Sequence, residues 1–218
     1  MLRQKSFLSF LLNVAGSFFA FIAVFFIAHY MGPDAIGAIS STTAFVGLFA
    51  IFGDLGFGLA HYKKVSEGKD LGKCVGTFSV IRLGTTIIMA FITIIILYGS
   101  YFFTGKYPFE TKYLSLFYII FGSAFLGNLL YVISYTFAAR VEKAKEGIVL
   151  ITQKASNSLL RVVVAISGLG IIWLAWSNLA GVIIGMIAAL LLFRKYPVGK
   201  FDYSLFKDYE SRNYCDRF

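Results

Sequence analysis

The sequence has few charged residues, few histidines and cysteines, and almost no proline. Asp, Glu, Lys and Arg together make up 14% of the 218 residues, about half of their usual share in a soluble globular domain. Hydrophobic residues make up 58% of the chain, which leaves too little polar surface to cover a single globule in water. This composition excludes an ordinary soluble domain and indicates a membrane protein.

The scarcity of reactive side chains excludes several kinds of site. The two histidines are far apart, and the two cysteines, Cys74 and Cys215, are single and unclustered, so we expect no metal site. Both cysteines fall on the predicted cytoplasmic side, where a disulfide is not expected. The chain has no nucleotide-binding glycine-rich loop and no HExxH or GxSxG motif. We therefore expect neither an enzyme nor a cofactor.

What the chain does contain is a series of long apolar segments. Each has at least 18 residues, near or above the roughly 20 that an α-helix needs to cross the hydrocarbon. Such segments must satisfy their own backbone hydrogen bonds, and the alternating pattern of a β-barrel strand is missing. We predict an all-α integral membrane protein, a lobe of six transmembrane helices within residues 1–193, with spans at about 7–30, 36–62, 74–104, 113–139, 148–173 and 176–193.

The two ends of the chain differ from the spans. In residues 194–218, Phe201, Leu205 and Tyr209 are spaced four apart, which predicts an amphipathic helix on the inner membrane surface. The last eight residues are polar and without pattern, and we expect them to fray. The basic start of the chain resembles a signal peptide, but its apolar run is too long and no cleavage site follows. We expect a retained membrane helix.

The net charge of +9 reflects where Lys and Arg lie. With the N-terminus inside, 15 of the 20 basic residues fall on the inner side, and the outer loops hold only Lys106 and Lys112. Positive residues gather on the cytoplasmic side of membrane proteins. We therefore predict a multi-pass protein of the plasma membrane with both termini in the cytoplasm, whose basic loops face anionic membrane lipids and not nucleic acid.

Polar side chains inside the spans carry the functional signal, because they are costly in lipid. Lys154, Asn157, Ser158 and Arg161 follow the spacing i, i+3, i+4, i+7, which is one face of a helix. We expect this face to line a hydrated cavity, with Lys154 about 9 Å and Arg161 roughly 20 Å from the inner end of the span. The alternative for Lys154 is that it reaches back to the inner surface. Asn13 of the first span is a further cavity candidate, for which helix packing is the favoured alternative.

Asp54 is the only acid well inside a predicted span. It lies eight residues before the inner end of the second span, and Arg82 lies eight residues after the inner start of the third. Both are therefore about 12 Å deep, and we predict that they form an ion pair. Three glycines surround the acid and predict a bend or a close helix contact, namely Gly53, Gly56 and Gly58.

Two motifs in this order resemble a known family. They are AHYMGPDAIGAIS at 28–40 and FGDLGFGLAHYKKVSEGKD at 52–70. Together they are similar to the N-terminal signature of the polysaccharide biosynthesis proteins of the multidrug/oligosaccharidyl-lipid/polysaccharide exporter superfamily, the Wzx-type flippases. The resemblance covers about residues 1–209. The matching positions are Gly32, Pro33 and Gly37 in the turn, with Ile36 where an aromatic is usual, and Asp54, Leu55, Gly56 and Gly58, with Phe57 where Leu is common.

The resemblance implies that the protein moves lipid-linked oligosaccharide from the inner to the outer leaflet by alternating access. It also implies a central cationic cavity, between two six-helix lobes, that holds the pyrophosphate and sugars of a polyprenyl-pyrophosphate-linked glycan. The candidate cations are Arg161, Lys154 and Arg82, and the other candidate cavity residues are Asn157, Ser158 and Asn13. Structural or gating roles are expected for Asp54, Gly53, Gly56, Gly58, Gly32 and Pro33.

The predicted number of helices departs from the family pattern. Members of the family that the sequence resembles usually have twelve or more helices, and six are predicted in this sequence. We therefore expect a truncated half, a frameshift product or a lobe that pairs with a second six-helix lobe. Two other functions stay open: a drug or small-molecule exporter of the same superfamily, and a membrane scaffold that transports nothing. The cationic face argues against a cationic drug as the substrate.

Overall fold

The structure, a computed structural model, describes residues 2–210. The tail predicted to fray, which includes Cys215, lies outside these residues. Within them every regular element is a helix, and six helices are long and apolar enough to cross a membrane, so the all-α membrane fold is confirmed. The elements are α1 (Leu2–Met31), α2 (Pro33–Asp54), α3 (Phe57–Ser66), α4 (Leu71–Thr104), the 3-10 helix η1 (Thr111–Tyr113), α5 (Leu114–Ala139), α6 (Lys143–Ile166), α7 (Ile171–Phe193) and α8 (Tyr203–Glu210).

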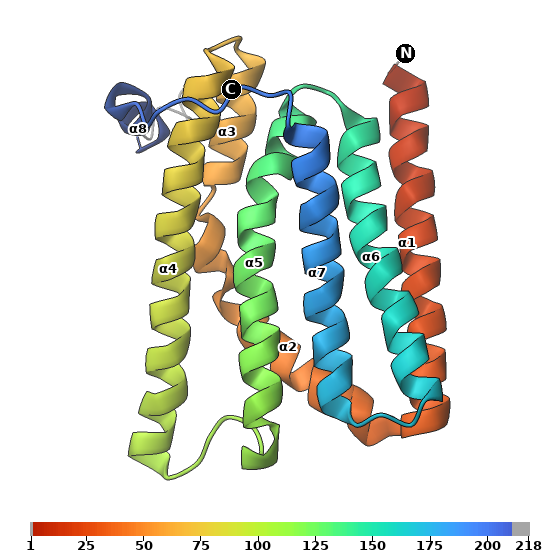
Figure 1. The fold of residues 1–218 in the computed structure, drawn as a ribbon. Coiled ribbons are helices and arrows are strands. Elements are labelled where there is room, and N and C mark those ends of the chain that lie inside the picture. The colour runs from red at the N-terminus through yellow and green to blue at the C-terminus, as the bar shows by residue number, and fades with distance from the viewer. Residues whose placement is uncertain (1, 211–218) are drawn as a thin grey trace.

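Five long helices stand roughly parallel, and α2 crosses them obliquely (Figure 1). The helix α1 begins and α7 ends at the same end of the bundle, where the turns between α3 and α4 and between α5 and α6 also lie (Figure 1). We call this the basic end, because its turns and helix ends hold most of the described basic residues: Arg3, Lys5, Lys63, Lys64, Lys69, Lys73, Arg140, Lys143, Lys145, Arg194 and Lys195.

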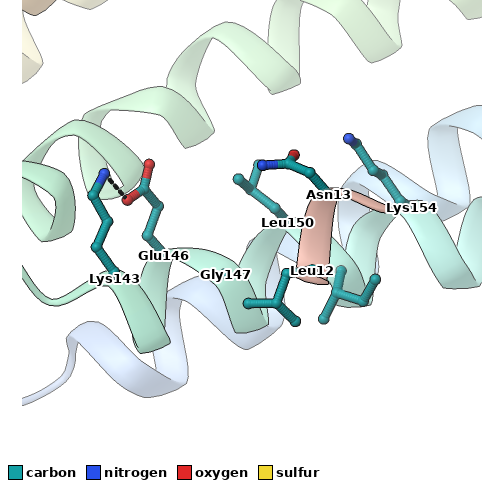
Figure 2. Close-up of a pocket in the computed structure, with 8 residues that line it drawn as sticks. Leu12, Asn13, Lys143, Glu146, Gly147, Leu150 and Lys154 are labelled. Atoms are coloured by element: carbon teal, nitrogen blue, oxygen red, sulfur yellow. Dashed lines mark hydrogen bonds and ion pairs between the residues drawn. The ribbon is translucent and has the colours of Figure 1, made fainter. Parts of the chain in front are cut away.

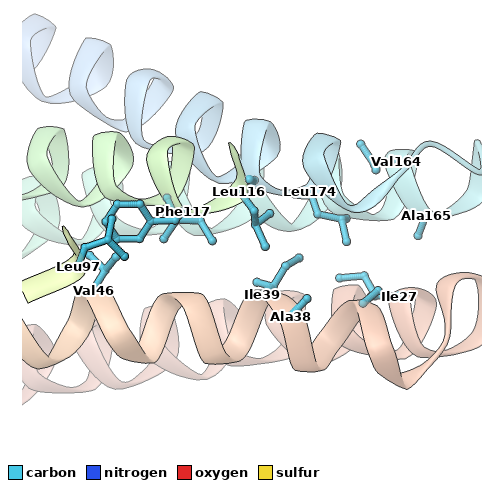
Figure 3. Packing of buried hydrophobic residues seen from close by; sticks show 13 residues of the cluster. Ile27, Ala38, Ile39, Val46, Leu97, Leu116, Phe117, Val164, Ala165 and Leu174 are labelled. Carbon is cyan, nitrogen blue, oxygen red and sulfur yellow. The ribbon is translucent and has the colours of Figure 1, made fainter. Parts of the chain in front are cut away.

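The core cluster drawn in Figure 3 lies at the opposite end of the bundle. It joins the end of α1 and α2 as far as Val46 to α4, α5, α6 and α7. Burial of these apolar side chains holds α1 and α2 together at their connecting turn. From there α1 and the α2–α3 segment diverge toward the basic end (Figure 1). The labelled members are Ile27, Ala38, Ile39, Val46, Leu97, Leu116, Phe117, Val164, Ala165 and Leu174.

The second predicted span, 36–62, is wrong as a continuous helix. The helix α2 ends at Asp54, where the Leu55 N–H closes the last turn on the Ile51 carbonyl. Leu55 (φ 48°) and Gly56 (φ 83°) both take left-handed backbone angles, which two consecutive residues of an α-helix cannot do. The bend that the surrounding glycines predict is therefore confirmed, as a break between α2 and α3.

The predicted turn between the fifth and sixth spans is also misplaced. The helix α6 ends at Ile166, just before Gly168, which has a φ of 66°, and α7 begins at Ile171. Trp173, the predicted last residue of the fifth span, therefore lies inside α7. The charges that bounded the predicted spans do not mark this turn, because glycine and not a charged residue ends the helix.

The segment after α7 is fastened to the basic end. The Gly199 N–H donates to the Gly72 carbonyl of α4 at 2.9 Å, and the Gly199 carbonyl lies against Gly76. The helix α8 follows, as the spacing of its apolar residues predicts. Its apolar face, however, packs on α3 and α4: Tyr209 is buried and Leu205 contacts the same cluster. Leu205 and Tyr209 of that face therefore cover protein, whereas Phe201 is exposed.

Candidate functional site

Three cavities lie between α1, α2–α3, α5 and α6, and we call this region the groove. The first, the lysine cavity, has a volume of about 120 Å³ and lies between α1 and α6. The second, the tyrosine cavity, has about 270 Å³ and is lined by α3, α5 and α6. A third, of about 260 Å³, reaches α2, α5, α6 and α7. The lining residues of the three cavities place the groove between α1 on one side and α2–α3 on the other.

The lysine cavity brings together two of the predicted cavity residues, Lys154 of α6 and Asn13 of α1 (Figure 2). The Lys154 side chain passes over Gly16, where a Cβ would come within 2.8 Å of its Cδ. The absence of a side chain at Gly16 therefore lets the two helices approach and gives the lysine its path. Lys143 and Glu146, paired at 2.7 Å, lie in the same cavity, in the first turn of α6 (Figure 2).

The observed bounds of α6 change the depth of both predicted cations. Lys154 lies 11 residues after Lys143 and 12 before Ile166, about 16 Å and 18 Å along the helix. It is thus near the middle of the span and not close to its basic end. Arg161 lies five residues before Ile166, or about 7.5 Å from the end opposite the basic end. The predicted order of depth holds, but the residue at mid-depth is Lys154.

Arg161 does not join Lys154 in the lysine cavity. Its Nε is buried and has no hydrogen-bond partner among the described residues. A buried guanidinium N–H without a partner is costly. The structure thus places Arg161 at an incompletely satisfied position near one end of α6.

The other two residues of the predicted polar face point elsewhere. Asn157 turns toward α7, where its Nδ2 donates to Asn178 Oδ1 at 2.6 Å, and Asn178 Nδ2 donates to Ser123 Oγ of α5 at 2.8 Å. Gly181 of α7 makes room for this contact, since a Cβ there would meet Asn157. Ser158 is buried. The stripe is therefore divided between a helix contact and the groove.

Asp54 and Arg82 form the predicted ion pair, which is confirmed. Arg82 also donates from Nε to the Asn128 carbonyl at 2.9 Å and from Nη2 to Asn128 Oδ1 at 3.1 Å. Its side chain is 2% exposed and Asp54 is 31% exposed. The two residues lie at equal depth because each is about a dozen residues from the α3–α4 turn. Arg82 is thus held in a structural network and lines none of the three cavities.

The glycines near this pair are positions where backbone or packing leaves no room for a side chain. A Cβ at Gly53 would lie 3.0–3.2 Å from the Asn128 amide, and one at Gly58 would clash with the Tyr135 ring. Gly56 has a left-handed φ of 83°. At the turn between α1 and α2, Gly32 has a φ of 81° and Pro33 occupies the first turn of α2, as proline does at helix starts.

Two polar clusters at the basic end escaped the prediction from sequence. Glu142, between α5 and α6, accepts hydrogen bonds from Lys145, Arg140 and Tyr196. Burial works to raise the pKa of Glu142, but these hydrogen bonds prevail and lower it to about 2. In α3, outside the spans, burial lowers the pKa of His61 to about 3. In the Glu142 cluster, Arg140 and Lys145 lie within three residues of Glu142, and only the Tyr196 contact joins distant parts of the chain. The partners of His61 come from different helices, and no local sequence pattern marks them.

His61 fastens α3 to two neighbouring elements. Its ring nitrogens lie 2.9 Å from Thr136 Oγ1 of α5 and 3.0 Å from the Tyr209 hydroxyl of α8. The ring also stacks on Phe78 of α4, with 4.3 Å between the ring centroids. A histidine in an apolar run is the only sequence signal for this contact.

Comparison with known proteins gives one match. The family described as "Polysaccharide biosynthesis protein" matches residues 2–210 of the chain. No curated protein and no solved structure matches it. The match covers the whole described range, so it includes the groove, the helix break and α8.

Proposed function

The chain belongs to the polysaccharide biosynthesis protein family, and on that premise we propose that it moves lipid-linked oligosaccharide across the cytoplasmic membrane. It is a multi-pass membrane protein with six apolar helices. The observation that carries the proposal is Lys154, a cation in the middle of a membrane-spanning helix that lines the groove with Asn13. Cations at this depth are expensive and mark pathways for charged substrates. A polyprenyl pyrophosphate is an anion of matching charge.

The break between α2 and α3 supports a mechanism of alternating access. Leu55 and Gly56 separate two helices that border the groove, and a few residues at the end of an element suffice as a hinge. On one side of the break, the Asp54–Arg82 pair fixes α2 to α4. On the other, α3 carries Tyr62 into the tyrosine cavity. In the proposed mechanism, α3 moves relative to α2 while the ion pair keeps α2 in place.

The polar residues of the groove also support a second six-helix lobe as a partner. Lys154, Asn13 and Glu146 would face lipid if nothing covered the groove, and polar side chains in that position are unfavourable. We assign the cover to a second six-helix lobe, with the substrate between the two lobes. The membrane orientation that we propose puts the basic end in the cytoplasm, because positive residues gather on that side.

A leaflet-transfer assay tests the function. The full chain, together with its second lobe, is placed in vesicles with a fluorescent polyprenyl-pyrophosphate-linked glycan, and arrival in the outer leaflet is followed with a quencher. Lys154→Gln removes the groove cation, and we expect transfer to fall about ten- to hundredfold, the value of a charge-assisted hydrogen bond.

Lys112→Gln is the matched control, because Lys112 is an exposed lysine of η1 at the opposite end and is paired with Glu110. Transfer by this variant is expected to equal that of the wild type. Equal transfer by Lys154→Gln and the wild type would remove the basis for the proposed site. Transfer of a neutral or cationic drug, with none of the glycan lipid, would favour the drug-exporter alternative.

A further inference from the structure

The tyrosine cavity contains a polar group without a partner. Ser134 of α5 is 7% exposed and lines the cavity, yet its Oγ makes no hydrogen bond to any described residue. Serine in a helix usually satisfies its hydroxyl on the carbonyl four residues earlier, as Thr136 does on Val132. A buried hydroxyl that is left open is unfavourable unless a ligand completes it.

Aromatic rings surround this hydroxyl. Tyr62 of α3 and Tyr131 and Tyr135 of α5 line the cavity with Ser134. Tyrosine offers a flat apolar face together with a hydroxyl that both donates and accepts hydrogen bonds. A sugar ring has the complementary surface, with C–H groups on its faces and hydroxyls at its rim. The cavity volume is about 270 Å³, the space of roughly nine water molecules at about 30 Å³ each. This space suits a single sugar ring better than a long glycan.

The tyrosine cavity adjoins the lysine cavity, because the two share lining residues. Glu146 and Leu150 of α6 line both, and Lys154 follows Leu150 by four residues, or about 6 Å along the helix. The carboxylate of Glu146, which is paired with Lys143 (Figure 2), therefore lies at the junction of the two cavities. When one part of a ligand binds at Lys154, the part attached to it can therefore lie in the tyrosine cavity.

We propose that the tyrosine cavity binds the first sugar of the lipid-linked glycan, with the pyrophosphate beside Lys154 in the lysine cavity. This rests on the proposed function and assigns specificity within that site. Ser134 donates to a sugar hydroxyl, and Tyr62 and Tyr131 hold the faces of the ring. Tyr131 is itself positioned by Arg82, whose guanidinium carbon lies 5.4 Å from the ring centroid, a cation–π contact.

Binding of two lipids to the purified full chain, together with its second lobe, tests the assignment. One is a fluorescent polyprenyl pyrophosphate without sugar, and the other is the same lipid with one hexosamine on the pyrophosphate. We expect the wild type to bind the sugar-bearing lipid more tightly. Ser134→Ala is expected to weaken the binding of only that lipid, by about three- to tenfold, as loss of one hydrogen bond does. The same change should leave the melting temperature equal or higher, because it removes an unsatisfied hydroxyl.

The controls separate ring stacking from general packing. Tyr62→Leu is expected to weaken binding of the sugar-bearing lipid. Tyr62→Phe is expected to retain that binding, since Phe keeps the ring face. Tyr101→Leu and Ser79→Ala are matched controls: Tyr101 is 49% exposed against 40% for Tyr62, and the Ser79 hydroxyl is satisfied by the Val75 carbonyl. Neither control should change binding of either lipid.

Three outcomes would overturn the assignment, and they differ in what else they affect. Equal wild-type affinity for the two lipids, with loss of both in Lys154→Gln, refutes the sugar subsite and leaves the proposed function standing. Equal weakening of both lipids by Ser134→Ala and Tyr62→Leu means that the lipid chain and not the sugar occupies the cavity. Binding of neither lipid by the wild type refutes the proposed function and the subsite together.

Discussion

Removing Asp54 should destabilise the protein through the buried cation that it leaves behind. Arg82 is 2% exposed, and its three described hydrogen bonds go to Asp54 and to the Asn128 backbone and side chain. In Asp54→Ala the guanidinium keeps the two Asn128 contacts but loses its counter-charge. A buried ion that loses its partner typically costs about 3–5 kcal/mol. Because the Asp54 carboxylate is 31% exposed, water replaces part of it, and we expect about 3 kcal/mol.

A double-mutant cycle isolates the pair. Arg82→Met removes the cation and leaves Asp54 able to turn toward water, so we expect a loss of roughly 2–3 kcal/mol, much of it from the open Asn128 acceptors. In the double variant neither charge remains unpaired, and the total loss should be smaller than the sum by about 2 kcal/mol. The surface pair Lys73–Asp202, 3.1 Å apart with Lys73 57% exposed, is the control, and Lys73→Met should cost about 1 kcal/mol or less.

Cys74 provides the assay, because it is fully buried in α4. In a Cys215→Ser background it is the only cysteine in the chain, and its reaction with a thiol probe reports unfolding in detergent as denaturant rises. Losses that add within about 0.5 kcal/mol in the double variant would show that the two residues are not coupled. That result would refute the role given to this pair in holding α2 to α4.

Three further predictions concern the backbone and the basic end. Gly56→Ala should lower stability by about 1 kcal/mol because the φ of Gly56 is 83°. Gly84 lies within α4 with open space beside it, so Gly84→Ala should raise stability by a similar amount. Melting temperatures of the two variants that move in the same direction would contradict this. Burial lowers the pKa of His61 to about 3, so the unfolded state binds more protons and stability should fall as pH drops from 6.5 toward 3. Acid titration of the melting temperature should be flatter in His61→Asn, and an unchanged slope would argue against the burial. Gly76→Val should push Gly199 off α4 and speed proteolysis of the segment before α8, while an unchanged cleavage rate would show that this contact does not hold the segment.

The helices were predictable where charged residues bound them and not where glycine ends them. The predicted fourth span, 113–139, nearly coincides with α5 at Leu114–Ala139, since charged residues stand near both ends. The α6–α7 turn was misplaced because Gly168 ends α6 through a left-handed backbone angle, which apolar content does not reveal. That error moved Arg161 to mid-depth in the prediction, the place that Lys154 occupies.

The sequence predicts which charged residues of the candidate site pair, but it does not predict how each helix is rotated about its axis. Counting depth on two antiparallel helices is enough to bring Asp54 and Arg82 together, because rise per residue is constant. Asn128, which completes that network, depends on how α5 is rotated about its axis, and one sequence does not fix this rotation. For the same reason the polar face of α6 looked uniform, although Asn157 meets α7 and Lys154 meets α1.

Photo-crosslinking tests the central claim most directly, that the lysine cavity between α1 and α6 holds the pyrophosphate. The probe is a polyprenyl pyrophosphate with a diazirine next to its phosphates, and crosslinked peptides are identified by mass spectrometry. We predict crosslinks to the segments around Asn13 and Lys154, competed by unlabelled lipid and lost in Lys154→Gln. Crosslinks confined to lipid-exposed residues of α4, such as Phe91 and Ile95, and unaffected by that change would contradict it.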